Sequence, residues 1–516
     1  MKPKGKVSLV GAGPGDPKLL TLRAYEVLKR ADVVLYDALV NPRILRLIRK
    51  DAVKYFVGRR AGNHRIMLDE AKAIMKKEAA KGKHIVHLKG GDPFIFGRGA
   101  EEALFLVSKG IEWEVVPGIS SATAVPAYAG IPLSLRHVNA MISFVAGHED
   151  PEKAVSQIDW AHLAKGQSTL VFLMGRKRLP AISAKLMQSG LPENTPCALI
   201  QWGTLPYQKT ITASLKMIAK KADLEHMMPP CIFIAGEVVR QRDKLQWIEK
   251  KSLFGKNIVV TRACSQAAAL ADALESNGAN VLELPTIQIE KPSNWTFVDR
   301  AIGDLADYDW VVFTSVNAVK IFMERLFERG LDGRAFGKAK IAVIGQSTCF
   351  ALDAFGLCAD LIPKDFVAES LLKAFKSKVN LPGKKILLPR AQGARDVLVE
   401  GLKKSGALVD PVVLYRTSVP KQDHDRVLER IRKGQVDWLT FTSSSTVQGF
   451  MSKVSKYPLS IFKNCLIASI GPITSKTLRS NGLKVHVEAK PYTINGLVQA
   501  MIKYKNKSVI KSKTKR

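Results

Sequence analysis

The chain has 516 residues, of which 46% are hydrophobic and 24% charged, and this length predicts two to four domains. No apolar run reaches the roughly 20 residues of a membrane-spanning helix, and glycines, Pro14 and Asp16 interrupt any signal-like apolar core, so we expect a cytoplasmic protein. The six cysteines form no C-x-x-C pair and the histidines do not cluster, so we expect no metal site.

The charge balance indicates an anionic partner. Lys and Arg number 79 and Asp and Glu number 46, which gives a formal net charge of +33. Nucleic acid is the default partner for such a chain, but no RNA-binding motif, helix-turn-helix pattern or zinc finger accompanies the charge, so we do not expect it. An anionic small molecule is equally compatible. Residues 506–516 add to the charge, and we expect them to form a basic disordered tail.

The first predicted element is a strand, "KVSLVGAG", that ends in the glycine-rich turn "GAGPGDP". The glycines alternate as in a dinucleotide-binding loop, but Asp16 stands where that loop has its last glycine. Because the Asp16 carboxylate would repel a phosphate, we expect a ligand without one. The alternative is a structural turn in which Asp16 caps the following helix, "PKLLTLRA".

Two further strands end in comparable turns. "HIVHLKGG" continues into "DPFIFGRG", and "WEVVPG" continues into "ISSATAV". A second Gly-Asp-Pro turn after a strand predicts a cofactor held by backbone atoms, with an Asp free to accept from a hydroxyl or amine. Ser120 and Ser121 of the third turn are candidates to bind the same ligand.

The second half contains an internal repeat, after a linker that we place at residues 249–255. "DWVVFTSVNAVKIF" at Asp309 matches "DWLTFTSSSTVQGF" at Asp437, and "IAVIGQSTCFAL" matches "IASIGPITSKTL". "IVVTRA" likewise matches "ILLPRA". The copies follow one order at nearly one offset, which predicts two similar α/β units. In both, polar Thr and Ser loops follow the strands and suit carboxylates, unless these residues only cap helices.

"LKGGDPFIFGRG", "VPGISSA", "ADVVLYDALV", "VGRRAGNH" and "TLVFLMGRKRL" closely resemble the uroporphyrinogen-III C-methyltransferase family. The resemblance implies a domain over residues 1–248 with the two-domain precorrin-type fold, and a homodimer through this half. It also implies S-adenosylmethionine as cofactor, which carries no phosphate. The implied cofactor contacts are Pro14, Gly90, Gly91, Asp92, Ile95, Ser120, Ser121, Met174 and Gly203.

The same resemblance implies catalytic residues. Asp37 of "LYD" would accept a proton from the substrate. The family often has Lys where this sequence has Arg59. Because arginine stays charged and binds carboxylates through two N–H groups, we expect Arg59 to clamp the substrate. His87 replaces the usual Arg before "LKGGDP", and we expect it on a strand, facing solvent or the domain seam.

"VVTRACSQA", "LLPRAQGARDVL", "VVLYRT" and "IGPITSKTL" are similar to the uroporphyrinogen-III synthase family, over residues 256–505. The resemblance implies one lobe from residues 256–290 and 417–505, and another from residues 291–416. It implies that Tyr415 is the acid that assists departure of the substrate hydroxyl, with core packing as the alternative role. The substrate contacts would be Thr314, Ser315, Thr442, Ser443 and Thr474.

Together the resemblances imply an α/β protein in which a two-domain tetrapyrrole methyltransferase fold precedes a two-domain uroporphyrinogen-III synthase fold with an internal repeat. The second half would cyclise hydroxymethylbilane to uroporphyrinogen III with inversion of the D ring. The first half would methylate that product at C2 and C7 to precorrin-2, for sirohaem or cobalamin synthesis. These polycarboxylate substrates suit a basic protein. The alternatives are a methyltransferase of this fold acting on a later corrin intermediate or RNA, and a tetrapyrrole-binding protein without catalysis.

Overall fold

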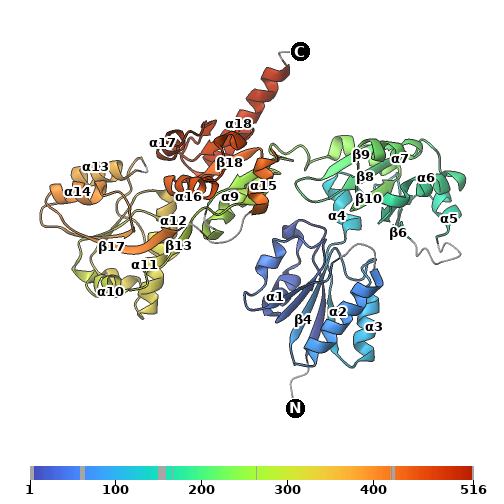
Figure 1. Cartoon of the computed structure of the whole chain (residues 1–516), viewed down its shortest axis with the longest axis horizontal. Helices are drawn as coiled ribbons and strands as arrows, with labels where there is room; N and C mark the ends of the chain where they lie inside the picture. Colours follow the sequence, from blue (N-terminus) through green and yellow to red (C-terminus); the bar gives the residue numbers. More distant parts are fainter. Residues whose placement is uncertain are drawn as a thin grey trace. The chain divides into compact units, whose positions relative to one another are not determined.

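The structure is a computed structural model, and it describes residues 5–58, 64–148, 158–166, 168–262, 264–365, 367–418, 420 and 425–513. These form two compact units (Figure 1). Unit 1 comprises Met1–Asn257 with Leu274–Asn280, and unit 2 comprises Ile258–Ala273 with Val281–Arg516. Each unit contains two five-stranded sheets, which agrees with the predicted α/β class. Within the described ranges, no helix combines the length and the apolar character that crossing a membrane requires.

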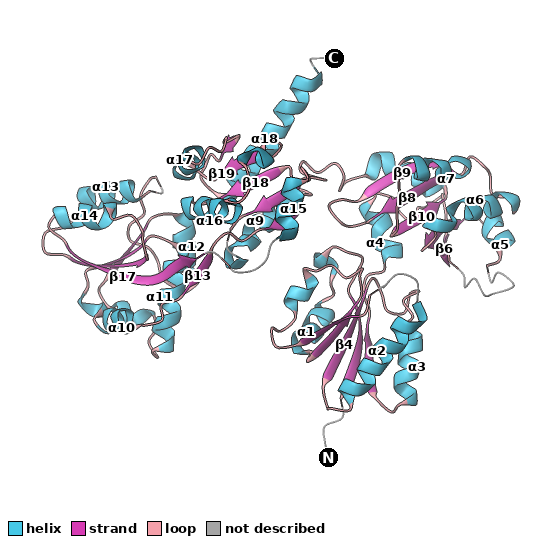
Figure 2. Cartoon of the chain, viewed as in Figure 1, coloured by secondary structure: helices cyan, strands magenta, loops and turns pink. Residues whose placement is uncertain are grey.

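The first lobe of unit 1 is a parallel sheet of strand order β3-β2-β4-β1-β5. Its strands are β1 (Lys6–Gly11), β2 (Val33–Tyr36), β3 (Val53–Phe56), β4 (His84–Lys89) and β5 (Glu112–Val116). Helix α1 (Leu22–Arg30) lies on one face, and α2 (His64–Ala79) and α3 (Gly99–Ser108) lie on the other (Figure 2). The central strands are apolar on both sides because both faces are covered.

Helix α4 (Ser121–Tyr128) connects the first lobe to the second. The second sheet has the order β6-β7-β10-β8-β9, in which β6 is parallel to β7 and the other pairs are antiparallel. Its strands are β6 (Met141–Ala146), β7 (Ser168–Leu173), β8 (Pro196–Gln201), β9 (Lys209–Ser214) and β10 (Cys231–Ala235). The covering helices are α5 (Trp160–Lys165), α6 (Leu179–Gln188) and α7 (Leu215–Leu224), and α8 (Arg242–Leu245) follows β10.

The first sheet of unit 2 has the order β12-β11-β18-β19-β20. Its strands are β11 (Asn257–Val260), β12 (Asn280–Glu283), β18 (Trp438–Phe441), β19 (Leu466–Ser469) and β20 (Val487–Glu488). The helices that accompany these strands in the chain are α9 (Cys264–Ser276), α15 (Asp425–Arg432), α16 (Ser444–Val454), α17 (Pro472–Ser480) and α18 (Ile494–Lys513).

The second sheet of unit 2 has the order β13-β17-β16-β14-β15. Its strands are β13 (Gln288–Glu290), β14 (Trp310–Phe313), β15 (Lys340–Val343), β16 (Lys385–Ala391) and β17 (Leu408–Ser418). Its helices are α10 (Thr296–Gly303), α11 (Val316–Glu328), α12 (Gln346–Asp353), α13 (Ala368–Lys378) and α14 (Val397–Lys404).

Each sheet of unit 2 contains strands from both copies of the sequence repeat. The first copy supplies β11, β12, β14 and β15 in chain order, and the second supplies β16, β17, β18 and β19. In space, β12-β11 continues into β18-β19, whereas β17-β16 continues into β14-β15. Each sheet therefore joins the first half of one copy to the second half of the other.

The loops that follow β1, β4 and β5 pack together at the carboxyl edge of the first sheet, through the backbone atoms of their glycines. Gly13 and Gly91 form an antiparallel bridge, in which each amide donates to the other's carbonyl at 3.2 and 2.8 Å. A Cβ added to Gly118 would lie 2.3 Å from the Gly91 carbonyl oxygen and 2.7 Å from Gly11 Cα. Because these neighbours are backbone atoms, only glycine permits the approach. The glycines of the opening turn thus serve contact between loops.

We expect Gly118→Ala to lower the free energy of unfolding by about 1–3 kcal/mol, the usual cost of overpacking. Urea denaturation measures the change. Gly303→Ala is the matched control, because a Cβ at this end of α10 meets nothing within 4 Å. Equal stability of Gly118→Ala and wild type would contradict the packing argument.

Candidate active site

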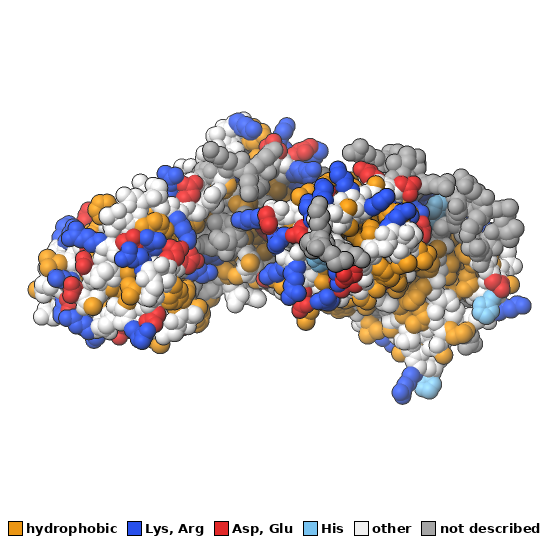
Figure 3. All heavy atoms as spheres, turned by 90° about the horizontal axis from the view of Figure 1, so that it is seen from below, with side chains coloured by type: hydrophobic (Ala, Val, Ile, Leu, Met, Phe, Trp, Pro, Cys, Tyr) orange, Lys and Arg blue, Asp and Glu red, His pale blue; other side chains and the backbone are white. Residues whose placement is uncertain are grey.

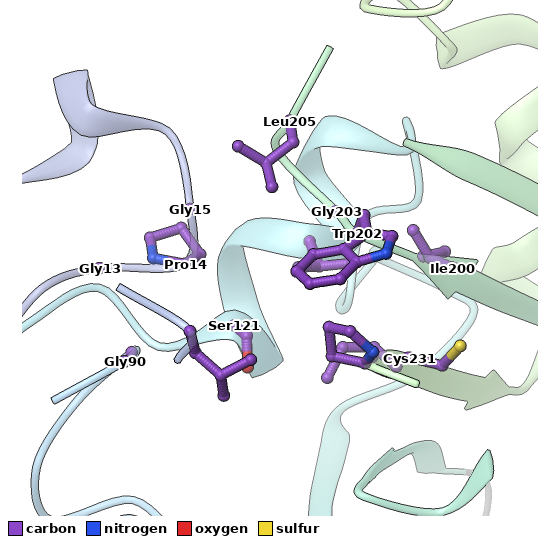
Figure 4. Close-up of a pocket in the computed structure, with 15 residues that line it drawn as sticks. Gly13, Pro14, Gly15, Gly90, Ser121, Ile200, Trp202, Gly203, Leu205 and Cys231 are labelled. Atoms are coloured by element: carbon purple, nitrogen blue, oxygen red, sulfur yellow. The ribbon is translucent and has the colours of Figure 1, made fainter. Parts of the chain in front are cut away.

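A cavity lies in unit 1, bordered by the glycine loops on one side and the second sheet on the other (Figure 4). Pro14 and the Trp202 ring lie on opposite sides of it. The residues that line it are Gly13, Pro14, Gly15, Leu39, Gly90, Gly91, Ser121, Val125, Ile200, Trp202, Gly203, Leu205, Pro230, Cys231 and Ile232. None of these described residues is charged, so the cavity offers backbone groups, one hydroxyl, one thiol, one indole and apolar surface.

Asp16 does not belong to this lining, because its carboxylate is occupied elsewhere. One oxygen accepts from the Lys18 amide at 2.9 Å and the other accepts from the Tyr128 hydroxyl at 2.9 Å. Burial and the Asp16 carboxylate raise the pKa of Tyr128, so the hydroxyl remains a donor. The alternative of a capping role is confirmed, although Asp16 caps the short 3₁₀ turn Pro17–Leu19, and α1 has its own cap in Thr21.

Five of the nine predicted cofactor contacts line the cavity, namely Pro14, Gly90, Gly91, Ser121 and Gly203. The other four lie outside its lining. Asp92 accepts from the amides of Phe94 (2.8 Å) and Gly118 (3.0 Å), and so joins the second loop to the third. Ser120 is buried and caps α4, whereas Ile95 and Met174 are exposed on the surface.

Asp37 lies just beyond β2, next to the cavity. One carboxylate oxygen accepts from the amides of Leu39 (2.7 Å) and Val40 (3.2 Å). The other accepts from the Gly90 amide at 3.2 Å. Since Leu39 and Gly90 line the cavity, Asp37 sits immediately behind its wall and fixes both loops. Arg59 lies outside the described residues.

A buried ion cluster lies beneath the Gly90–Gly91 loop. Glu102 of α3, 1% exposed, binds His87 Nδ1 at 3.0 Å and Lys89 Nζ at 2.7 Å. Burial raises the pKa of Glu102, but His87 and Lys89 outweigh burial and hold that pKa below its usual value. The prediction that His87 faces solvent or the domain seam was wrong, because α3 covers this face of β4 and supplies a carboxylate partner.

In unit 2, two of the predicted synthase residues meet. The hydroxyls of Tyr415 and Ser315 are 3.0 Å apart. The Tyr415 ring is buried in the apolar core beneath α11, so core packing accounts for the ring, while the hydroxyl reaches the polar loop after β14. Ser315 also caps α11 through the Ala318 amide at 3.1 Å. Thr314 is half-buried in the same loop.

The remaining candidates lie at the other sheet of unit 2. Ser443 caps α16 in a reciprocal box with Thr446, and Thr442 precedes it. Thr474 is buried in α17 after the neighbouring parallel strand β19. The capping role is therefore confirmed for Ser315 and Ser443. Substrate binding by all five polar residues stays a prediction, and they are distributed over two sheets rather than gathered at one.

The two halves of the chain match two families. Residues 6–219 match the family "Tetrapyrrole (Corrin/Porphyrin) Methylases", and residues 268–499 match "Uroporphyrinogen-III synthase HemD". The relative "Porphyrin biosynthesis protein HemD" of Ruminiclostridium josui is 34% identical over 498 residues, which cover 96% of this chain and 98% of the relative. The chain belongs to this family of porphyrin biosynthesis proteins.

Other relatives resemble the first half of this HemD-family chain. "S-adenosyl-L-methionine-dependent uroporphyrinogen III methyltransferase" of Methanosarcina barkeri is 46% identical over 47% of the chain and 94% of the relative. The chain spans about half the length of the siroheme synthases that it matches, such as 53% of that of Hahella chejuensis. The crystal structure of uroporphyrin III C-methyl transferase from Thermus thermophilus is 38% identical over 46% of this chain and 99% of that one, with a TM-score of 0.40.

The cavity of this HemD-family protein fits S-adenosylmethionine by the chemistry of its lining. Backbone amides and carbonyls suit a zwitterionic amino-acid group, the apolar side chains suit an adenine ring, and the lining offers no cation for a phosphate. Burial raises the pKa of Cys231 to about 12. This thiol therefore stays protonated and does not compete as a nucleophile for an electrophilic methyl group.

The motifs did not reveal much of the second wall of the cavity. Ile200, Trp202, Leu205, Pro230, Cys231 and Ile232 come from strand ends with no glycine–aspartate pattern. Gly203 was the one residue of this wall that was predicted, and in the structure its neighbours Trp202 and Thr204 both have positive φ, at 49° and 69°. Such backbone is uncommon for residues with side chains and is often found at functional sites.

We expect Glu102→Gln to lower the free energy of unfolding near neutral pH by about 3–5 kcal/mol, because Lys89 and His87 lose their buried partner. The folded-state pKa of Glu102 lies below the ordinary value of 4.5, so its stabilisation is present above that pH and disappears as pH falls further. Urea unfolding at neutral pH and at about pH 3.5 measures both effects.

Glu101→Gln is the control on the same helix, because Glu101 is half-exposed and pairs with Arg98 at the surface. The Glu101→Gln substitution should lower the free energy of unfolding by less than about 1 kcal/mol. A Glu102→Gln penalty that is equally large at both pH values would contradict the assignment.

Proposed function

We propose that the chain is a bifunctional enzyme of tetrapyrrole synthesis. Unit 2 cyclises hydroxymethylbilane to uroporphyrinogen III, and unit 1 methylates that product at C2 and C7 to precorrin-2. The observation that carries the proposal is the uncharged cavity, with its wall of glycine loops, in a chain whose two halves match families for these consecutive steps. The net charge of +33 suits such polycarboxylate substrates, and a cytoplasmic location is part of the proposal.

Methyl transfer depends mainly on positioning in this proposal. S-adenosylmethionine supplies an electrophilic methyl group to an electron-rich pyrrole carbon. The glycine loops and the Trp202–Leu205 wall hold the cofactor, and Ser121 adds a hydroxyl. Asp37 accepts the proton that the substrate releases, and its position behind Leu39 and Gly90 supports this role. Arg59 clamps a substrate carboxylate.

Ring closure needs acid assistance and exclusion of water. Tyr415 donates a proton to the departing hydroxyl group, so the C–O bond breaks, water leaves and the pyrrole nitrogen stabilises the azafulvene. The hydrogen bond between Tyr415 and Ser315 supports this role, because it places the hydroxyl at a polar loop. Thr314, Ser315, Thr442, Ser443 and Thr474 bind the substrate's carboxylates.

The two steps can be blocked separately. Given hydroxymethylbilane and S-adenosylmethionine, wild type should form precorrin-2. Asp37→Asn should stop at uroporphyrinogen III, with methylation slowed roughly 10²–10⁴-fold. Tyr415→Phe should slow formation of the D-ring-inverted product by a similar factor, and should methylate added uroporphyrinogen III at the wild-type rate. Chromatography with absorbance detection measures the products.

Each variant is the control for the other, because the unaltered half must keep its activity. Failure of wild type to form any C-methylated tetrapyrrole would overturn the bifunctional proposal. Methylation of ribosomal RNA without methylation of uroporphyrinogen III would support the RNA alternative instead. Unchanged rates in Asp37→Asn or Tyr415→Phe would reject the role of that residue.

The proposed homodimer forms through the methyltransferase half. Strand β6 is an edge strand of its sheet and exposes Met141, Ile142 and Phe144. Apolar side chains also gather over unit 1 in Figure 3, in the right-hand part of the view. An exposed apolar edge strand is a ready surface for pairing with a second chain.

We expect Phe144→Lys to convert the dimer to a monomer of 56.7 kDa, because a lysine on an edge strand disfavours pairing. Light scattering after gel filtration measures the mass. Leu224→Lys, at an exposed end of α7 in the same lobe, should remain dimeric. A monomeric wild type would contradict the proposal.

A further inference from the structure

The segment after the last strand of unit 1 reaches the cavity through a chain of hydrogen bonds. It comprises residues 242–249, beyond the stretch 6–219 that matches the methylase family. Glu249 lies within it and accepts from three side chains. Gln208 Nε2 donates at 2.9 Å, Thr210 Oγ1 donates at 2.7 Å, and Arg242 forms an ion pair with the second carboxylate oxygen.

The first of these contacts continues to the cavity wall. Gln208 Oε1 accepts from the Thr204 amide at 2.9 Å, and Thr204 Oγ1 accepts from the Asp16 amide at 3.1 Å. Thr204 and Gln208 are both buried, so each bond is shielded from water. The chain of bonds thus joins Glu249 to both walls, because Gly203 and Leu205 flank Thr204 and Gly15 precedes Asp16.

The strained backbone of the Trp202–Gln208 loop explains why this loop needs a side chain that holds its conformation. Trp202 and Thr204 have φ values of 49° and 69°, which cost free energy for residues with a Cβ. The Gln208 side chain holds the Thr204 amide in that conformation, and Glu249 fixes Gln208 from behind. Without the carboxylate, the Gln208 amide group loses its 2.9 Å acceptor, and the buried Arg242 keeps the Ala129 carbonyl but loses its ion-pair partner.

A second contact from the same segment reaches the Asp16 turn through the end of α4. The Trp247 indole donates to the Ala127 carbonyl at 3.0 Å and packs edge-on against Tyr128, with ring centroids 5.2 Å apart. Tyr128 in turn donates to Asp16. Asp16 is therefore tied to residues 242–249 by two routes, one through Thr204 and one through Tyr128.

We propose that Glu249 is a positioning residue for the cofactor cavity, which sets the Trp202–Gln208 loop against the Asp16 turn and thereby raises affinity for S-adenosylmethionine. The inference deepens the proposed function and rests on it. The hydrogen-bond partners of Glu249 are Gln208, Thr210 and Arg242, which do not line the cavity, so Glu249 acts through Gln208 and Thr204. The methyltransferase site accordingly extends to the segment that leads into unit 2.

The test uses the full chain and S-adenosylhomocysteine as the binding probe, measured by calorimetry. Glu249→Ala should raise the Kd of the probe about tenfold, the size expected when a hydrogen bond to a charged group is lost. The KM for S-adenosylmethionine should rise in parallel, while kcat at saturation changes less than about twofold. Glu249→Gln, which keeps the shape, should fall between wild type and Glu249→Ala.

Two comparisons separate positioning from a general loss of stability. Glu237→Gln alters an exposed carboxylate that pairs with Arg240 in the preceding turn, and it should leave Kd unchanged. Thr204→Ala should also raise Kd, and the double variant should lose less binding free energy than the sum of the two single losses, because both act through one chain of bonds. The urea unfolding transition of each variant, followed for unit 1, reports whether that unit remains folded, because the synthase activity belongs to unit 2.

The possible failures are distinguishable. If wild type does not bind S-adenosylhomocysteine, the proposed function fails. If wild type binds it and folded Glu249→Ala and Glu249→Gln bind equally well, the positioning role is overturned. Additive effects of Thr204→Ala and Glu249→Ala on Kd would overturn the proposed route through Thr204.

Discussion

The first unit depends on the close approach of three backbone loops, which only glycine permits. A Cβ on Gly11 or Gly118 would overlap the backbone of a neighbouring loop, Gly91 has a positive φ of 70°, and Gly13 bridges to Gly91. The loops therefore form one wall whose surface is mainly backbone. A wall of this kind presents amides and carbonyls to a ligand without long side chains, which suits a cofactor that must be held in one orientation.

The carboxylates near these turns hold the loops in place. Asp16, Asp37 and Asp92 each accept at least one backbone amide, and Asp37 and Asp92 each connect two different loops. Short acidic side chains commonly bond to nearby backbone in this way. The same groups that first appeared as possible ligand contacts are thus parts of the support. For Asp37, support and proton acceptance are compatible because it borders the cavity.

The second unit shows a different constraint, in which the repeat in the sequence and the sheets in space do not coincide. The repeated polar loops after β14 and β18 begin helices in the same manner, through Ser315 and Ser443. Yet each lies in a sheet completed by strands of the other copy. The two copies therefore share the strand length at β14 and β18 and the cap of the helix that follows. Their strands nevertheless pair with segments that are distant in the chain.

The sequence by itself determined the α/β class, the strands of the glycine turns and the repeat, because these depend on local periodicity and on backbone requirements of glycine. Five residues of the cavity lining were implied by the resemblance to the methyltransferase family. Tertiary structure alone decided the second wall around Trp202, the burial of His87 against Glu102 and the connection of Glu249 to Thr204. These features join residues that are far apart in the chain and carry no common motif. Their pairing follows from which helix covers which strand, and no local pattern records that choice.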